Sequence, residues 1–529
     1  MSAQDYPLLI KNLLLAPRRA PTRNRIRYRD VSGYDYATFG ERVARLGSAL
    51  VSLGVRQGDT VAVMDWDTPR YLECYFAIPM LGAVLQTVNV RLPQEHVRYT
   101  IDHAGASVLL CNLEFLPLLE SVRAGLPRVR KVICLTDSGA APSGFPFDGE
   151  YEQLLESGDP GHRFPDFDEN TRATTFYTSG TTGLPKGVYF SHRQLALHTL
   201  AVLDAMQIRP SEVYMPITPM FHAHAWGLPY AATVAGIDQI YPGRYLPDLL
   251  VRLVLEQKVT ISHCVPTILE MMLNSPAAQG RKLTGWRVLI GGEALTSALC
   301  RQALERGIDV FSGYGMSETG PALSFARVPP ELAGDPASEV EYRIKAGLPL
   351  PLVDLRVVDA EMHDVPHDGT TAGEIVARAP WLTRGYHDDE KASAALWAGG
   401  YLHTQDIGTI DRHGYLVVTD RIKDVIKTGG EWVSSLQLEE ILGRNETVAE
   451  AAVIGIPDPK WGERPMAIVV PRPGSAPDPA DLNAWLLQRV ARGEIPKFAV
   501  PERFAVVDSL EKTSVGKIDK KFLRRKYGA

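Results

Sequence analysis

The sequence predicts an α/β protein with more than one domain. Short apolar segments, such as residues 60–64 and 287–290, alternate with helix-like stretches, which is typical of parallel sheets covered by helices. From about residue 350 the pattern changes to short strands between Gly, Asp and Pro turns, and after Asp420 helices and strands mix. A chain of 529 residues is also longer than a single core usually supports.

The first half of the chain carries the predicted parallel strands. Residues 8–15 are rich in leucine but contain Lys11, and no small-residue cleavage site follows, so we expect a short amphipathic helix and no signal peptide. Apolar residues recur at helical spacing from Phe39 to Leu53, and Gly54 stands where that helix would end. The expected strands are residues 60–64, 83–88, 107–110, 132–135, 260–262 and 287–290, with a second helix at about 71–81.

The second half predicts a small antiparallel β subdomain and then an α+β unit. The expected β-subdomain strands are residues 355–358, 374–377 and 415–418. The elements expected beyond them are helices at 436–442 and 482–490 and strands at 450–456 and 466–470. We place the boundary at about residue 422, which divides the chain into domains of residues 1–422 and 423–529.

Composition excludes several classes of function. The net charge of −6 leaves no basic footprint for nucleic acid. The most apolar segment, residues 74–85, is about half the length needed to cross a bilayer, so we predict no membrane span. The five cysteines are scattered without metal-ligand or disulfide spacing, which favours a reducing, cytoplasmic location.

Residues 177–187 form the most informative segment. Eight of these eleven residues are Ser, Thr, Gly or Lys, so the segment can present hydroxyls, backbone N–H groups and one ammonium to a polyanion. Pro185 before Lys186 and Gly187 after it depart from the P-loop pattern of common NTPases. We interpret the segment as a different phosphate-binding loop, with a plain surface turn as the alternative. The candidate phosphate contacts are Thr178, Ser179, Gly180, Thr181, Thr182, Gly183 and Lys186.

Several later segments also combine glycine with one or two polar residues. They are residues 219–227, 291–295, 312–319, 401–406, 420–424, 429–432 and 512–517. With the phosphate loop, and in this order, they resemble the motifs of the adenylate-forming (AMP-forming) acyl-CoA synthetase superfamily over nearly the whole chain. The pairing of residues 221–230 with 429–435 is most similar to medium- and long-chain fatty acyl-CoA synthetases.

The resemblance implies a fold and a two-step reaction. The large domain would hold two αβ-layered subdomains and the small β subdomain, followed by a mobile α+β cap. A carboxylic acid would attack the α-phosphate of ATP, giving an acyl-adenylate and pyrophosphate, and coenzyme A would then take the acyl group and release AMP. The implied cofactors are ATP, Mg²⁺ and coenzyme A.

The resemblance also assigns roles to residues of the first step. Lys517 matches the catalytic lysine, Arg421 the cation near the α-phosphate, and Asp406 the carboxylate that accepts the ribose hydroxyls. Glu318 matches the magnesium ligand, with Thr178 as a second candidate. The further nucleotide contacts implied are Gly291, Gly292, Glu293, Ala294, Ser312, Gly313, Tyr314, Gly315, Met316 and Ser317, of which Tyr314 would stack on adenine.

Two more groups of residues follow from the resemblance. The acyl pocket would be formed by Phe221, His222, Trp226, Gly227, Gly292 and Gly315, with His222 also near the reacting carboxylate. The second step would use Gly429, Gly430, Glu431 and Trp432, after the cap turns about a hinge at Lys423.

Three positions depart from the family pattern. Gln405 stands where a glycine usually precedes the ribose-binding aspartate, which puts the local backbone geometry in question. Glu511 replaces a frequent proline. Glu293 replaces a small residue, and we expect its side chain to face solvent.

Some interpretations stay open. His222 and Trp226 could be plain core residues, and the basic run of residues 520–526 could be a solvated helix face. The acid could be aryl or alicyclic, the acceptor could be a carrier protein, or the chain could be a non-catalytic nucleotide-binding regulator. The resemblance also allows a homodimer, and a lysine acetyltransferase and deacetylase acting on Lys517.

Overall fold

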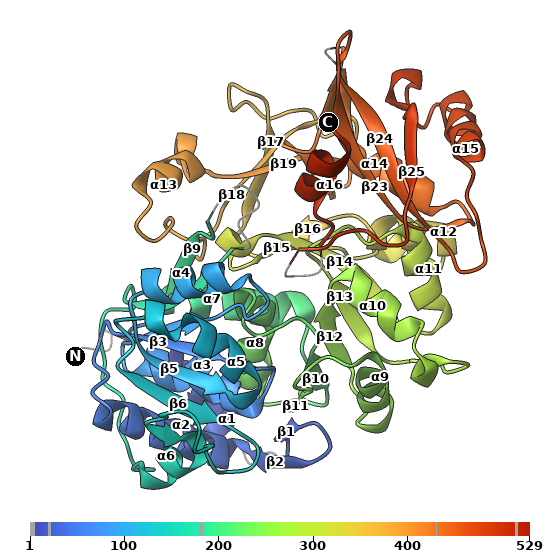
Figure 1. The fold of residues 1–529 in the computed structure, drawn as a ribbon. Helices are drawn as coiled ribbons and strands as arrows, with labels where there is room; N and C mark the ends of the chain where they lie inside the picture. The colour runs from blue at the N-terminus through green and yellow to red at the C-terminus, as the bar shows by residue number, and fades with distance from the viewer. Residues whose placement is uncertain (1–5, 20–22, 179–183, 430, 514–516, 529) are drawn as a thin grey trace.

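The computed structural model describes residues 6–19, 23–178, 184–429, 431–513 and 517–528 (Figure 1). The described residues form four sheets, of seven, nine, four and five strands. The two larger sheets make up the lower body in Figure 1, and the two smaller ones lie above it. The α/β class with a separate C-terminal unit is therefore confirmed.

The seven-stranded sheet is parallel except for its last pair, in the order β7-β6-β5-β3-β4-β8-β9. Its strands are β3 (Thr60–Met64), β4 (Val84–Thr87), β5 (Ala106–Asn112), β6 (Lys131–Leu135), β7 (Gly149–Glu150), β8 (Arg172–Tyr177) and β9 (Gly187–Ser191). The predicted strands at 60–64, 83–88, 107–110 and 132–135 are thus confirmed. The hairpin β8–β9 encloses the phosphate-loop segment.

The nine-stranded sheet has a parallel centre with antiparallel edges, in the order β16-β15-β14-β13-β12-β10-β11-β1-β2. Its strands are β1 (Arg25–Tyr28), β2 (Ser32–Asp35), β10 (Val213–Pro216), β11 (Asp238–Tyr241), β12 (Ile261–Cys264), β13 (Arg287–Ile290), β14 (Asp309–Gly315), β15 (Ala322–Phe325) and β16 (Leu348–Pro349).

The alternation of side chains along the strands explains why helices cover both faces of each sheet. In β3, Val61 and Val63 join the core that the two large sheets share, whereas Ala62 and Met64 join an outer core. The shared core takes in α2 (Tyr36–Ser52), α3 (Pro69–Met80), α7 (His192–Met206) and α8 (Leu228–Ala235). The helices that contribute to the two outer cores include α4 (Gln94–His103), α5 (Leu116–Val122), α9 (Pro247–Glu256), α10 (Pro266–Leu273) and α11 (Ser297–Glu305).

The four-stranded antiparallel sheet is the predicted β subdomain. Its strands are β17 (Asp354–Val358), β18 (Gly373–Arg378), β19 (Leu402–Ile410) and β20 (Leu416–Arg421). Strand β19 was not predicted from the sequence, because its first half contains the polar run His403–Asp406 and no apolar segment marks it as a strand. That polar run forms part of the site described below.

The C-terminal unit packs three helices on a five-stranded sheet with its own apolar cores. Its elements are β21 (Ile426–Thr428), β22 (Glu431–Val433), β23 (Val448–Asp458), β24 (Gly462–Pro471), β25 (Arg503–Val506), α14 (Ser435–Gly443), α15 (Pro479–Ala491) and α16 (Lys520–Tyr527). Since β20 ends at Arg421 and β21 already belongs to this sheet, the change of sheet falls close to residue 422. The boundary as a division between moving domains stays a prediction.

The remaining helices are short: α1 (Leu15–Arg19), which follows the 3₁₀ turn Ile10–Leu14, and α6 (Tyr151–Ser157), α12 (Pro336–Arg343) and α13 (Glu390–Leu396). No helix in the described ranges is both long enough and apolar enough to cross a bilayer.

Candidate active site

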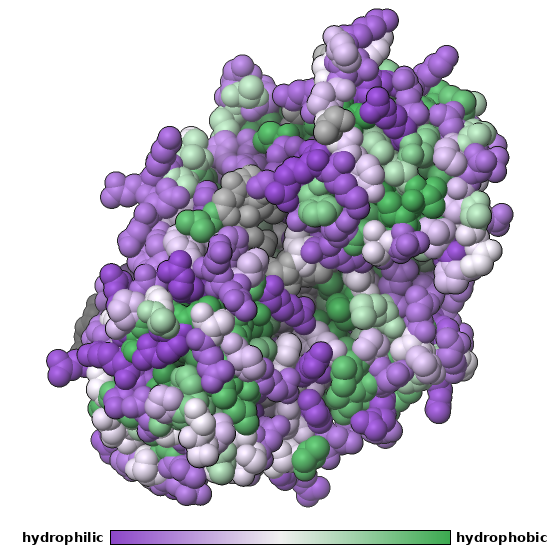
Figure 2. Space-filling view, in the orientation of Figure 1, coloured by the Kyte–Doolittle hydropathy of each residue, from purple (hydrophilic) through white to green (hydrophobic). Residues whose placement is uncertain are grey.

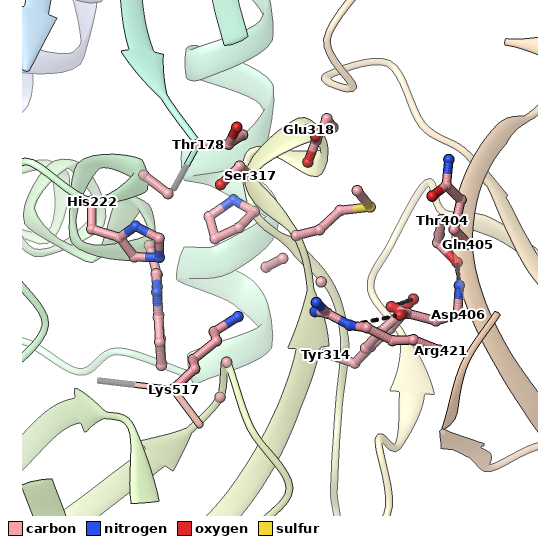
Figure 3. Close-up of a pocket in the computed structure, with 18 of the residues that line it drawn as sticks. Thr178, His222, Tyr314, Ser317, Glu318, Thr404, Gln405, Asp406, Arg421 and Lys517 are labelled. Atoms are coloured by element: carbon pink, nitrogen blue, oxygen red, sulfur yellow. Dashed lines mark hydrogen bonds and ion pairs between the residues drawn. The ribbon is translucent and has the colours of Figure 1, made fainter. Parts of the chain in front are cut away.

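A cavity of about 290 Å³ lies where the body, the β subdomain and the C-terminal unit meet (Figure 3). Several of its walls follow the carboxyl ends of parallel strands, the usual ligand edge of an open α/β sheet. The predicted site residues that line it are Thr178, Lys186, His222, Trp226, Gly291, Gly292, Gly313, Tyr314, Gly315, Met316, Ser317, Glu318, Asp406, Arg421, Lys423 and Lys517. Residues separated by more than 300 positions in the sequence thus face one cavity.

The two described ends of the phosphate-loop segment are hydrogen-bonded to each other. The Thr178 N–H donates to the Lys186 carbonyl (3.0 Å), and the Lys186 N–H donates to the Thr178 hydroxyl oxygen (3.2 Å). Residues 179–183, which include five of the predicted phosphate contacts, lie outside the described residues. The two described ends face the cavity, so the segment starts and finishes at its rim.

Glu318 is held by a tyrosine that sequence analysis missed. The Tyr386 hydroxyl donates to Glu318 Oε1 (2.7 Å), and the Lys186 ammonium lies 4.5 Å from the centre of the Tyr386 ring. Burial raises the pKa of Glu318, while the Tyr386 hydrogen bond and the charge of Lys186 favour the carboxylate. The carboxylate is therefore oriented at the cavity wall beside the lysine of the phosphate loop.

Asp406 is the centre of a second polar cluster. Tyr314 donates its hydroxyl to Asp406 Oδ2 (2.8 Å), and Arg421 Nε lies 3.2 Å from Asp406 Oδ1 (Figure 3). Antiparallel pairing of β19 with β20 places Asp406 directly opposite Arg421. Burial raises the pKa of Asp406, and Arg421 opposes that rise. An ionised carboxylate has room for more than these two donors, so it can also accept from a ligand.

The backbone at Gln405 explains why glycine suits this position. Its φ is +59°, in the left-handed region where a side chain on Cβ is strained. The glutamine therefore adopts the left-handed backbone conformation that favours glycine, and Asp406 still faces the cavity.

Lys517 reaches the cavity from the C-terminal tail. Figure 3 shows its side chain pointing between His222 and Arg421. Burial, and then the charge of Arg421, lower the pKa of Lys517 to about 8. At neutral pH the side chain is still mainly an ammonium, although a poorly solvated one.

Gly292 gives this lysine its space. Its φ of +82° favours glycine, and a Cβ there would lie 3.4 Å from Lys517 Cε. Burial, followed by the charge of Lys517, lowers the pKa of His222 to about 3, so this imidazole is neutral at the cavity wall.

His222 and Trp226 flank an unusual backbone segment. Residues 223–227 all have positive φ, from 45° to 78°, and four of them carry side chains. Such a run is costly for L-residues and persists only where surrounding packing imposes it. It turns the Trp226 ring toward Gly291, where a Cβ would lie 3.1 Å from the indole. His224 is buried, and its Nε2 lies 2.7 Å from the Thr174 hydroxyl, so it is a core residue.

Several predicted site residues do not line the cavity. Phe221 is buried in the core shared by the large sheets, and Gly227 lies against the His198 ring. Gly429 and Glu431 lie on the β21–β22 hairpin, where the Gly429 N–H donates to the Trp461 carbonyl (2.8 Å). Ser312 and Ala294 are also off the cavity wall. Gly430 and the side chain of Trp432 lie outside what the structure describes.

The expectation that Glu293 faces solvent is wrong. Its Oε1 accepts the backbone N–H of Ile518 (2.8 Å), the residue after Lys517. The physical reason is that the C-terminal tail crosses this turn and covers it. Sequence spacing could not show a contact between residues 225 positions apart.

Other lining residues were missed by sequence analysis, notably Tyr386, His403 and Thr404. Thr404 and His403 belong to β19, and a search for polar residues at the end of the run 401–406 could have found them. Tyr386 lies in an irregular turn after β18, and no periodic signal marks such a position.

The donor set fits a magnesium ion bound with a triphosphate. Mg²⁺ is usually held by one or two protein oxygens together with phosphate oxygens and water. Glu318 and the Thr178 hydroxyl supply oxygens of this kind on one cavity wall. No cluster of three or more His, Cys, Asp or Glu that could hold a metal alone is found in the described parts of the chain.

Comparison with known proteins assigns the family. Residues 16–387 match the family model described as AMP-binding enzyme, and residues 437–517 match the AMP-binding enzyme C-terminal domain. The chain therefore belongs to the AMP-binding enzyme family.

Particular relatives are similar over almost their whole length. A long-chain-fatty-acid–CoA ligase of Thermus thermophilus is 40% identical, over 95% of this chain and 92% of the relative. A 3-methylmercaptopropionyl-CoA ligase of Ruegeria pomeroyi is 36% identical, over 93% and 92%. The crystal structure of ATP-bound MatB from Rhodopseudomonas palustris superposes with a TM-score of 0.86 at 26% identity, covering 99% of both chains.

Proposed function

We propose that this protein is an AMP-forming acid–thiol ligase that converts a medium- or long-chain fatty acid to its acyl-CoA. The acid is activated as an acyl-adenylate with release of pyrophosphate, and coenzyme A then displaces AMP. The observation that carries the proposal is the meeting of Lys517 with Glu318, Asp406 and Arg421 in one cavity. Family membership and the named CoA ligases among the relatives support it.

The nucleotide would lie along the wall formed by these clusters. The phosphate-loop segment and Lys186 suit the β- and γ-phosphates, because hydroxyls, N–H groups and an ammonium neutralise a polyanion. Asp406 would accept the ribose hydroxyls, as it is already oriented by Tyr314 and Arg421. The Tyr314 ring would lie against adenine.

Glu318 and Thr178 would hold the magnesium ion. The ion would neutralise charge on the phosphate oxygens during attack on the α-phosphate. Tyr386 fixes the Glu318 carboxylate through its hydroxyl, and Lys186 beside the Tyr386 ring adds positive charge to the same wall.

Lys517 would act on the reacting groups of the first step. Two anions, the acid and the α-phosphate, must approach one another, so positioning and charge neutralisation are the main needs. The Lys517 ammonium points between His222 and Arg421. From this position it would contact both the carboxylate of the acid and the α-phosphate. Neutral His222 can donate one N–H to the carboxylate.

The second step would need another cap orientation. Gly429 and Glu431 do not line the cavity, whereas Lys423, close to the change of sheet, does. Rotation about Lys423 would withdraw Lys517 and bring the β21–β22 hairpin to the acyl-adenylate.

Pyrophosphate release across a panel of carboxylic acids, with and without coenzyme A, tests the proposal. Release with fatty acids, and acyl-CoA formation only when coenzyme A is present, is the expected result. Faster release with aryl or alicyclic acids would change the substrate class. Adenylation without transfer to coenzyme A would favour a carrier-protein acceptor, and no release with any acid would contradict the enzyme assignment.

Three finer proposals follow the same reasoning. A cytoplasmic location suits the five cysteines, which are all buried and free of disulfides. Acetylation of Lys517 by an acetyltransferase would remove its charge, and a deacetylase would restore it. A homodimer stays a prediction that sedimentation can test.

A further inference from the structure

One short segment of the body carries two contacts to the C-terminal unit. Residues 293–297, which we name the docking turn, are the last part of the connection from β13 to α11 and the first residue of that helix. The Glu293 carboxylate accepts the Ile518 N–H (2.8 Å). Ser297 donates its hydroxyl (2.6 Å) and its N–H (3.2 Å) to Glu440 Oε1 on α14. The docking turn therefore touches the cap at two places that are far apart in the cap sequence.

The first contact bears directly on Lys517. Ile518 is the next residue, so fixing its N–H restricts where the Lys517 Cα can lie. Within the cap, Thr513 holds the backbone of Lys517 from the other side. The Thr513 N–H donates to the Lys517 carbonyl (2.6 Å), and the Lys517 N–H donates to the Thr513 hydroxyl (3.3 Å). Gly291 and Gly292, just before the docking turn, are cavity walls. The same loop thus shapes the cavity and holds the residue next to Lys517.

The charge of Glu293 suits this position. Burial raises the pKa of Glu293, whereas the hydrogen bond from the Ile518 N–H and then the charge of Lys517 oppose that rise and favour the carboxylate. Charge-assisted hydrogen bonds of this kind are stronger than neutral ones. The contact exists only while the tail crosses the docking turn, so it favours one cap orientation over any other.

The second contact uses the start of a helix. Ser297 is the first residue of α11, which spans nine residues, and Glu440 accepts its N–H and its hydroxyl together. An anion at this end also interacts favourably with the helix dipole. The partner residue Glu440 is itself bound by Arg444 (3.3 Å), so its carboxylate is held in place from the cap side.

We propose that the docking turn is a latch that selects the adenylate-forming orientation of the cap, with Glu293 as the positioning residue for Lys517. This inference rests on the proposed two-step function. It predicts that weakening the latch slows the first step without slowing the second. The second step would even gain, because the competing orientation becomes easier to leave.

The first experiment compares the two half-reactions in Glu293→Ala, Glu293→Gln and Glu440→Ala. Acyl-adenylate formation should fall about 10- to 100-fold in Glu293→Ala, as expected when a catalytic group loses its position. Glu293→Gln keeps an acceptor oxygen and should recover most of that loss. Thioester formation from supplied acyl-adenylate should be unchanged or faster in all three variants. The matched control is Glu446→Ala, because Glu446 is an exposed cap residue.

Equal losses in both half-reactions, or unchanged adenylation in Glu293→Ala, would overturn the latch. An unaltered wild-type chain that forms no adenylate with any acid would instead overturn the proposed function. The two failures are therefore separate.

A second experiment reads cap orientation without catalysis. Fluorescent labels on introduced cysteines at Arg252 and Leu487, both exposed, report the distance between body and cap, since the native cysteines are buried. Glu293→Ala and Glu440→Ala should each shift the energy-transfer distribution away from that of the labelled parent, whereas Glu446→Ala should not. A distribution unchanged by Glu293→Ala would overturn the latch.

Discussion

At the scale of single residues, burial decides the chemistry of the site. The Lys517 ammonium lies close to the Arg421 cation, and desolvation acts in the same direction, so its pKa is lowered to about 8. Burial likewise lowers the pKa of His222 and raises the pKa of the Glu318 and Asp406 carboxyl groups. In each case burial favours the uncharged form of the group. The cavity thus combines ionisable groups whose charges respond to their surroundings rather than to their residue type alone.

The first prediction concerns pH. A lysine with a pKa of about 8 is charged below that pH and neutral above it, so kcat/KM for adenylate formation should fall as pH rises through about 8. Thioester formation from supplied acyl-adenylate should not fall in this range, because a thiol becomes more nucleophilic as it ionises. Pyrophosphate release and thioester formation measured from pH 6 to 10 check both. A kcat/KM for adenylate formation that does not fall as pH rises through 8 and beyond 9 would contradict the role assigned to Lys517.

The second prediction concerns Tyr386. Tyr386→Phe removes the hydroxyl that orients Glu318 but keeps the ring beside Lys186. Outer residues that orient a metal ligand typically contribute 10- to 100-fold, so the apparent affinity for Mg²⁺ should fall about 10-fold or more. The measurement is the adenylation rate at a fixed ATP concentration over a range of Mg²⁺. The control is Tyr401→Phe, whose hydroxyl binds Asp354 away from the cavity. An equal response in both variants would remove Tyr386 from the metal site.

At the scale of elements, the carboxyl ends of the parallel strands and one strained segment shape the cavity. Residues 223–227 hold left-handed backbone angles and direct the Trp226 indole to the wall. The indole is 7% exposed and packs near Gly291 and the His263 ring, 5.1 Å between ring centres. Trp226 therefore limits the space beside the expected acyl group.

The third prediction follows from this wall. Trp226→Ala should enlarge the pocket and shift kcat/KM toward longer or bulkier acids, by about 10-fold relative to the parent preference. It should also lower stability by roughly 3–5 kcal/mol, since a large buried side chain is removed. The acid panel gives the first quantity and thermal unfolding indicates the second. Trp226→Phe separates the two effects by keeping much of the packing. An unchanged preference among the acids in both variants would mean that Trp226 is a core residue with no role in selecting the acid.

At the scale of the whole molecule, the residues that face the cavity come from three parts of the fold. Lys517 belongs to the cap, whereas Glu318 and His222 belong to the body and Asp406 to the β subdomain. Figure 2 shows hydrophilic residues bordering the hollow between the lower body and the upper part of the molecule. The contacts of the docking turn with the cap are hydrogen bonds, from Ile518 to Glu293 and from Ser297 to Glu440, and polar contacts are common where two domains meet.

The fourth prediction tests this division of labour. Lys517→Ala should reduce adenylate formation by about 10²–10³-fold or more, because a charge that stabilises the transition state is lost. Thioester formation from supplied acyl-adenylate should persist. The two half-reactions are measured separately, with Lys521→Ala, a change on an exposed residue of α16, as the control. Equal losses in both steps would contradict alternation of the cap.

Much of the architecture was predictable because it is local. Short apolar runs between helix-like stretches identified β3, β6 and β13 almost to the residue, and the change of pattern near residue 350 located the β subdomain. The glycine-rich motifs gave the candidate site, since motif order along the chain carries the family resemblance. By contrast, β19 was missed because its polar residues serve the cavity rather than a core.

The sequence by itself determined the fold class, the family and the residue types available for binding a nucleotide. It did so because strand patterning, turn chemistry and motif spacing are properties of neighbouring residues. Only the tertiary structure decided that Tyr386 orients Glu318, that Trp226 faces the cavity from a left-handed turn, and that Glu293 holds the tail beside Lys517. Those contacts join segments that are 68 to 225 positions apart or depend on strained backbone, and no local pattern encodes either.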